Sequence, residues 1–360
     1  MEKNESTDIE KLISIRVIQE DAETIMSLLQ SERSPVFLLA VMPYYALFVK
    51  ACQEFFDNDY IPENVSSQIA SIRNYIKSSG DRFSKIKSRI EEVDFEQNEQ
   101  FKNQLKYAFL KNWNVHWNMG TYWTDDRHII GNTQMIADYL GINNSFDRTE
   151  NDRQYDLALK ISSFVSSIQS GFSKVLTPPK IFRPKKGVTI NWFYDLNTNT
   201  ELLLFNNNYP KEINIFLLDL LCSMNFVKYI LRPLLVRNNW LLRIEYITTY
   251  YTFRGLQRIR NQRFSVGKDL INIDLLADII DLKPEVFNSR FRNCMMHYGL
   301  ENREVIKDEY LELPFYGIVE SCFPDTDYNS YLHKLNELSN RLIEYLESVF
   351  NSSDIKLQRL

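Results

Sequence analysis

The stretch Pro284-Glu285-Val286-Phe287-Asn288-Ser289-Arg290-Phe291-Arg292-Asn293-Cys294-Met295-Met296-His297-Tyr298-Gly299 is the best guide to the fold of this chain. Proline is favoured in the first turn of an α-helix and glycine just past a helix end, so the pair predicts a helix over residues 284–298. Further helices are predicted at residues 212–231, 238–263, 274–280 and 328–350 from their apolar spacing. This half of the chain is therefore expected to form a helical bundle.

Composition supports the same fold class. The 360 residues include ten glycines and eleven prolines, and 44% of the chain is hydrophobic. Long apolar-periodic stretches lie between the few glycines and prolines, which favours helices over many short strands. We expect a mainly α protein with a substantial core.

The first part of the chain also predicts a series of helices. They are expected at residues 8–29, 62–80, 81–110, 132–140 and 151–175. The first is open to a second interpretation, because Ile13, Ile15 and Val17 alternate with Ser14 and Arg16 as in a short strand. The apolar stretches at residues 36–50 and 213–231 are interpreted as buried helices, the first too short for a bilayer and the second interrupted by polar residues.

The composition changes at residues 177–187, where three prolines, a glycine and four cations predict a linker or exposed arm. Beyond it, Val188, Ile190, Trp192 and Tyr194 alternate with other residues, and after a polar turn comes a second apolar run, residues 201–205. This pattern predicts a β-hairpin. We expect three parts: an N-terminal helical domain at 1–176, a linker and hairpin at 177–208, and a C-terminal helical domain at 209–360.

The cysteines and the N-terminus bear on the compartment. Cys52, Cys222, Cys294 and Cys322 form no CxxC pair, so neither a zinc ribbon nor a disulfide framework is indicated. The N-terminus is acidic and lacks the basic and apolar regions of a signal peptide. We expect a cytoplasmic protein with no metal site, no cofactor and no membrane partner.

Three residues near the end of the 284–298 helix are the candidate catalytic residues. Arg292 offers a planar fork of donors for phosphate oxygens, and His297 can give or take a proton near neutral pH. Asn293 lies four residues before His297 on the same helix face, so it is expected to hydrogen-bond the imidazole. Arg292 and His297 would lie about 140° apart on an ideal helix, a gap that arginine's reach or a departure from the helix must close. The helix dipole is expected to raise the pKa of His297.

The pattern Arg292-Asn293-x-x-x-His297 resembles the signature of the HEPN superfamily, all-helical domains many of which are metal-independent ribonucleases. The resemblance covers roughly residues 209–350. It implies attack of an RNA 2′-hydroxyl on its phosphodiester, with a homodimer supplying a second copy of the motif. Some toxins of the superfamily carry a tyrosine two residues after the histidine for modification by an antitoxin; here Gly299 stands there and Tyr298 precedes it.

A cationic stretch precedes the motif. Residues 228–268 contain nine basic residues and one acid, Glu245. Arg254, Arg258, Arg260 and Arg263 are expected to contact an RNA backbone, or to form a solvated helix face. Upstream, Trp113, Trp117 and Trp123 are interpreted as a core plug rather than a base-stacking surface.

We therefore expect a metal-independent endoribonuclease that leaves 2′,3′-cyclic phosphate ends and acts as a toxin or antiviral defence effector, with an antitoxin or regulatory partner. The alternative is a non-catalytic HEPN-like module that binds RNA or a nucleotide while its N-terminal domain recruits a partner. No glycine-rich phosphate loop points to nucleotide hydrolysis instead.

Overall fold

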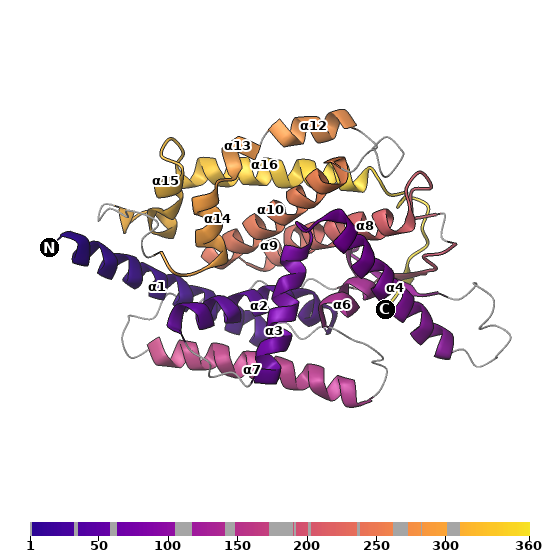
Figure 1. Ribbon diagram of the computed structural model, residues 1–360, viewed down its shortest axis with the longest axis horizontal. Helices are drawn as coiled ribbons and strands as arrows, with labels where there is room; N and C mark the ends of the chain where they lie inside the picture. Colours follow the sequence, from indigo (N-terminus) through magenta and orange to yellow (C-terminus); the bar gives the residue numbers. More distant parts are fainter. Residues whose placement is uncertain are drawn as a thin grey trace.

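The structure, a computed structural model, is mainly helical (Figure 1), and it includes a small antiparallel sheet. It describes residues 2–31, 35–57, 63–104, 117–140, 148–172, 190, 192–200, 203–235, 238–261, 273–281, 283–300 and 310–360. This confirms the expected fold class. The linker expected at 177–187 lies outside the described residues, as do Trp113 and Arg263.

The helices expected in the first part of the chain are present. They are α1 (Glu2–Ser31), α2 (Pro35–Phe56), α3 (Glu63–Ser78), α4 (Phe83–Gln104), α6 (Thr133–Leu140) and α7 (Arg148–Phe172). Because α1 is helical throughout, the strand interpretation of Ile13 to Val17 is wrong. Helix α2 continues through Pro43, which has no N–H for the carbonyl of Leu39; that carbonyl instead accepts the hydroxyl of Tyr139.

The sheet joins segments that are far apart in sequence. Its order is β2-β1-β3-β4, with β1 (Met119–Trp123), β2 (Ile129–Asn132), β3 (Trp192–Leu196) and β4 (Gln358–Arg359), and all pairings are antiparallel. The strand expected around Trp192 is present, but it pairs with β1 and β4, and residues 203–205 form bends. The hairpin that does form is β1–β2. Trp123 is fully buried as expected, whereas Trp117 is 61% exposed.

The C-terminal helices build the bundle around α10. They are α8 (Lys211–Asn225), a π-helical turn (Phe226–Leu231), α9 (Arg232–Leu234), α10 (Asn239–Asn261), α12 (Ile273–Asp281), α13 (Lys283–Val286), α14 (Ser289–Met296), α15 (Ile318–Cys322) and α16 (Tyr328–Glu347). Helix α10 packs against α1, α8, α14 and α16. Gly255 permits its close approach to α8, since a Cβ there would lie 2.9 Å from the ring of Phe216.

Two helices occupy the region expected to hold one. The chain breaks between α13 and α14, where the side chain of Asn288 accepts the backbone N–H of Phe291 at 2.7 Å. This bond satisfies a donor that the first turn of a helix leaves free, so Asn288 begins a new helix. The expectation of one continuous helix over residues 284–298 was wrong for this reason.

One hydrophobic core runs through the described parts of both halves. Its buried side chains come from α1 and α2 as well as from α8, α10, α14 and α16. The domain boundaries at residues 176 and 208 stay a prediction. Within the described residues, one helical stretch, Lys211–Leu234, has the length and hydropathy of a membrane span, and 83% of its most apolar window is buried. That burial agrees with the interpretation of residues 213–231 as core.

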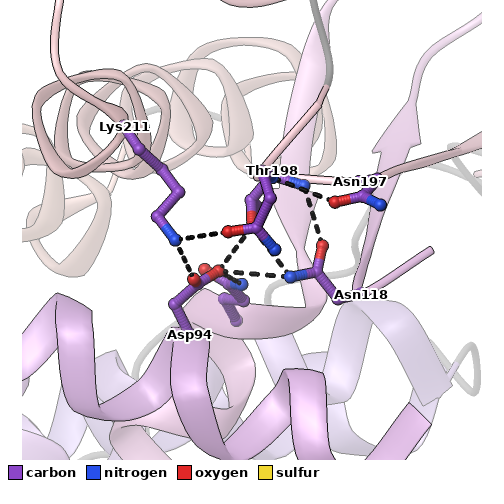
Figure 2. A network of polar contacts seen from close by, with 7 residues as sticks. Asp94, Asn118, Asn197, Thr198 and Lys211 are labelled. Atoms are coloured by element: carbon purple, nitrogen blue, oxygen red, sulfur yellow. Dashed lines mark hydrogen bonds and ion pairs between the residues drawn. The ribbon is translucent and has the colours of Figure 1, made fainter. Parts of the chain in front are cut away.

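A buried polar network joins the sheet to the helices (Figure 2). Asp94 of α4, 4% exposed, accepts hydrogen bonds from Thr198 (2.7 Å) and Gln134 (2.5 Å) and pairs with the ammonium of Lys211 (2.6 Å). Asn118 donates to the same carboxylate and to Thr198. One acid is thus matched by one cation and several neutral donors, which is the arrangement expected of a buried charge with a structural role.

Candidate active site

The Arg-Asn-x-x-x-His motif lies at the end of α14. Arg292 and Asn293 are in the helix, whereas His297 follows it in an extended conformation (φ −137°, ψ 153°). The backbone N–H of His297 still bonds the carbonyl of Asn293 at 2.9 Å. The ideal-helix separation of Arg292 and His297 therefore does not apply, because the chain leaves the helix before the histidine.

A buried arginine from α10 fixes this helix end. Nη1 of Arg243 donates to the carbonyls of Cys294 and Met295, both at 2.7 Å, and so satisfies acceptors that a helix C-terminus leaves free. Its Nε bonds Asp21 of α1 at 3.1 Å, and the hydroxyl of Tyr298 donates to the same carboxylate at 2.6 Å. Burial raises the pKa of Asp21 to about 6 despite the opposing effect of Arg243. The backbone just before His297 and the side chain just after it are thus anchored by the buried Arg243 and Asp21.

Glu54 at the end of α2 contacts the imidazole. Its Oε2 lies 2.9 Å from Nδ1 of His297, and its two oxygens lie 3.2 and 3.3 Å from the guanidinium nitrogens of Arg73 on α3. A carboxylate at Nδ1 favours the tautomer that carries its proton there, which leaves Nε2 free to accept a proton. The side chains of His297 and Glu54 are 36% and 34% exposed, so the imidazole is open to a ligand.

Two expectations about the motif need correction. Asn293 was expected to orient the imidazole, but its Oδ1 accepts Nη2 of Arg292 at 2.8 Å, and Glu54 contacts the imidazole instead. The pKa of His297 was expected to rise at the helix end. It is lowered from the ordinary value of 6.5, because partial burial disfavours the charged imidazole more than Glu54 favours it. At neutral pH the imidazole is therefore mainly uncharged and can accept a proton.

The cluster carries more positive than negative charge. Lys77 lies one turn after Arg73 on α3, and the charges of Arg73, Glu54 and Arg292 all act on its pKa. Within the described part of the chain, neither Lys77 nor Arg292 forms an ion pair with an acid. Burial, with repulsion from Arg73 and Arg292, lowers the pKa of Lys77, although the carboxylate of Glu54 opposes the shift. Among the described residues, the buried Nε atoms of Arg73 and Arg292 have no hydrogen-bond partner. Such unpaired donors cost about 1–3 kcal/mol each.

The arginines expected to contact RNA separate into different roles. Arg258 donates from Nε to the carbonyl of Gly80 at 3.2 Å, so it ties α10 to the end of α3. Arg254 bonds Gln257 at 3.3 Å on the same helix, and Arg260 lies on the last turn of α10, part-exposed. Arg263 lies outside the described residues. The RNA contacts of all four stay a prediction.

Sequence reasoning missed Glu54, Arg73 and Lys77, because no motif links them to residues 292–297. Arg73 did leave a signal. It lies four residues after Ile69 and three before Ile76, on the buried face of α3, and is only 8% exposed. A cation at an apolar position of a helix needs a specific partner, and here that partner is Glu54.

Other polar sites in the described residues are weaker candidates for a functional site. A cavity of about 570 Å³ lies between α9 and the first turns of α10 and α16, but its arginine, Arg232, already pairs with Glu245 at 2.6 Å. No group of three His, Cys, Asp or Glu residues in the described chain is placed to hold a metal ion. The cluster of Glu54, Arg73, Lys77, Arg292 and His297 is therefore the site we consider, and we call it the His297 cluster.

No protein-family model, curated protein or solved structure matches this sequence.

Proposed function

We propose that the protein is a metal-independent endoribonuclease of the HEPN type, with His297 and Arg292 as its catalytic residues. The observation that supports this best is the part-exposed imidazole of His297, whose Nδ1 lies 2.9 Å from the carboxylate of Glu54. A neutral imidazole oriented in this way is suited to general-base catalysis near neutral pH. Its place beside unpaired cations suits a reaction at phosphorus.

In the proposed reaction, Nε2 of His297 removes the proton of an RNA 2′-hydroxyl, and the 2′-oxygen attacks the adjacent phosphorus. The bond to the 5′-oxygen breaks, leaving a 2′,3′-cyclic phosphate on one fragment and a 5′-hydroxyl on the other. Arg292 stabilises the negative charge that develops on the phosphorane oxygens. Asn293 holds the guanidinium of Arg292 through the 2.8 Å hydrogen bond and so acts as a positioning residue.

The leaving 5′-oxygen needs a proton, which the imidazole that serves as base cannot easily supply at the same moment. A homodimer with two copies of residues 292–297 in one cleft would provide a second imidazole as the acid, because a two-fold interface presents the same surface twice. We propose such a dimer, acting on cytoplasmic RNA in a toxin or antiviral defence role, with an antitoxin or regulatory partner that controls it.

The test is incubation of purified protein with tRNA and structured RNA in excess EDTA, followed by analysis of the new ends. We expect fragments with cyclic phosphates from the parent protein and from His333→Ala, a control at an exposed histidine of α16. Arg292→Ala and His297→Ala should make none. Cleavage that persists in both variants would overturn the assignment of the site.

The rival function is non-catalytic binding of RNA or a nucleotide, with the N-terminal half recruiting a partner. Lys77 and Arg292, which form no ion pair in the described chain, favour this function together with Arg254 and Arg260, because cations can bind phosphates without any chemistry. This function predicts RNA affinity in the parent, no cleavage products, and affinity that is nearly unchanged in His297→Ala.

A further inference from the structure

We infer that Arg73, Lys77 and Arg292 together form a binding site for a phosphate group, so that two of its three cations come from the N-terminal half of the chain. The motif alone supplies only Arg292. The identity of the ligand as an RNA phosphodiester rests on the proposed function, whereas the binding of a phosphate group does not.

Unmatched charge is the first argument. Of the three cations only Arg73 has a carboxylate partner, and that carboxylate, Glu54, also contacts His297. Lys77 and Arg292 form no ion pair among the residues described. Burial and repulsion from the two arginines act against the charge of Lys77, and the carboxylate of Glu54 offsets this only in part. Keeping cations together in a partly buried place is unfavourable, and an anion bound between them would relieve that cost.

Unused hydrogen-bonding capacity is the second argument. The side chain of Arg73 is 90% buried, yet its Nε has no partner in the described chain, and the same is true of Nε of Arg292. Buried donors are nearly always paired in proteins. A guanidinium that turns to present its donors to phosphate oxygens would regain these bonds, and arginine forks match phosphate geometry.

The position of Glu54 gives the site a distinctive property. The carboxylate occupies donors of Arg73 that a phosphate oxygen would also use, so Glu54 and the ligand compete for Arg73. The same carboxylate orients His297 for the proposed proton transfer. Removing its charge should therefore strengthen phosphate binding and weaken cleavage, two effects of opposite sign from one substitution.

The test is calorimetric titration of the full chain with inorganic phosphate at constant ionic strength. Lys77→Gln should bind phosphate about tenfold more weakly, since hydrogen bonds to charged groups are among the stronger ones. Glu54→Gln should bind it more tightly. Arg341→Gln, which removes a part-exposed arginine of α16 whose Glu337 partner lies 3.8 Å away, should bind as the parent does. Arg73→Gln should also weaken binding. Lys77→Gln is the more informative variant, because Lys77 is less buried than Arg73 and its replacement should disturb the fold less.

A second titration uses a 2′-O-methyl RNA oligonucleotide, which has phosphodiesters but cannot undergo 2′-hydroxyl attack. Competition with inorganic phosphate, and weaker binding in Lys77→Gln, would support a phosphodiester of RNA as the ligand. Phosphate binding without such competition would overturn the RNA assignment and leave a site for a free phosphate compound.

The inference is wrong if the parent does not bind phosphate, or if Lys77→Gln binds it as tightly as the parent. Neither result affects the nuclease proposal if the parent protein cleaves RNA and His297→Ala does not. Conversely, phosphate binding that depends on Lys77 in a protein without cleavage activity would overturn the nuclease proposal alone.

Discussion

The His297 cluster and the Asp94 network are built from similar groups, and they differ in how completely those groups are matched. In the Asp94 network, one carboxylate that is 4% exposed receives a cation, Lys211, and neutral donors (Figure 2). In the His297 cluster one part-exposed carboxylate, that of Glu54, contacts both Arg73 and the imidazole, and the cations Lys77 and Arg292 form no ion pair in the described chain. A matched network stabilises the fold, whereas an unmatched one has capacity left for a ligand.

The largest effect should come from removing the acid of the matched network. Asp94→Ala leaves several buried neutral donors without their acceptor and removes the carboxylate partner of the part-exposed Lys211, so we expect a loss of about 3–5 kcal/mol in unfolding free energy. Urea denaturation would measure it, with the exposed Asp354→Ala as control. A loss of stability no greater than in the control would show that the Asp94 network does not stabilise the fold.

A second effect concerns a buried acid outside both sites. Asp219 of α8 accepts Nδ2 of Asn132 at 2.8 Å, and burial raises its pKa from 3.8 to about 7. Since the folded pKa lies above the unfolded one, its contribution to stability is full below about pH 4 and is lost as pH rises to about 7.

Asp219→Asn should abolish this dependence, and we expect the parent to lose roughly 2 kcal/mol more than the variant between pH 5 and 7. Thermal unfolding at several pH values measures the difference. Equal pH dependence in both proteins would show that the carboxylate of Asp219 is already ionised in the fold.

The next effect sharpens the role of Glu54. In Glu54→Gln the imidazole loses a carboxylate that both orients it and raises its pKa, so cleavage should fall by about tenfold. The pH at which the rate reaches half its maximum should also move lower. A purely structural role for Glu54 would lower the rate without moving this profile.

The smallest effect should come from a solvated charge. Arg260 lies on the last turn of α10, part-exposed. Arg260→Gln should weaken RNA binding only about two- to threefold. It should also reduce the slope of log affinity against log salt concentration by about one. Filter binding over a range of salt concentrations tests this, with Arg341→Gln as the control. A much larger loss would place Arg260 inside the site.

The helices could be predicted because their apolar spacing is local, and the break before α14 could not, because it depends on whether the side chain of Asn288 bonds the backbone of Phe291. Likewise, Arg292 and His297 were found through a short pattern, but Glu54 lies 243 residues from His297. Contacts across such distances are set by how helices pack. The partners of β3 were missed for the same reason, since β1 and β4 come from distant parts of the chain.

The most direct test measures cleavage rate and unfolding temperature in the same samples of parent, His297→Ala and Asp94→Ala, in EDTA. We expect His297→Ala to keep the parent's unfolding temperature and to lose at least about a hundredfold in the rate of cyclic-phosphate formation. Asp94→Ala should unfold at a lower temperature yet cleave normally while it remains folded. Cleavage by His297→Ala at the parent's rate would show that His297 is not a catalytic residue.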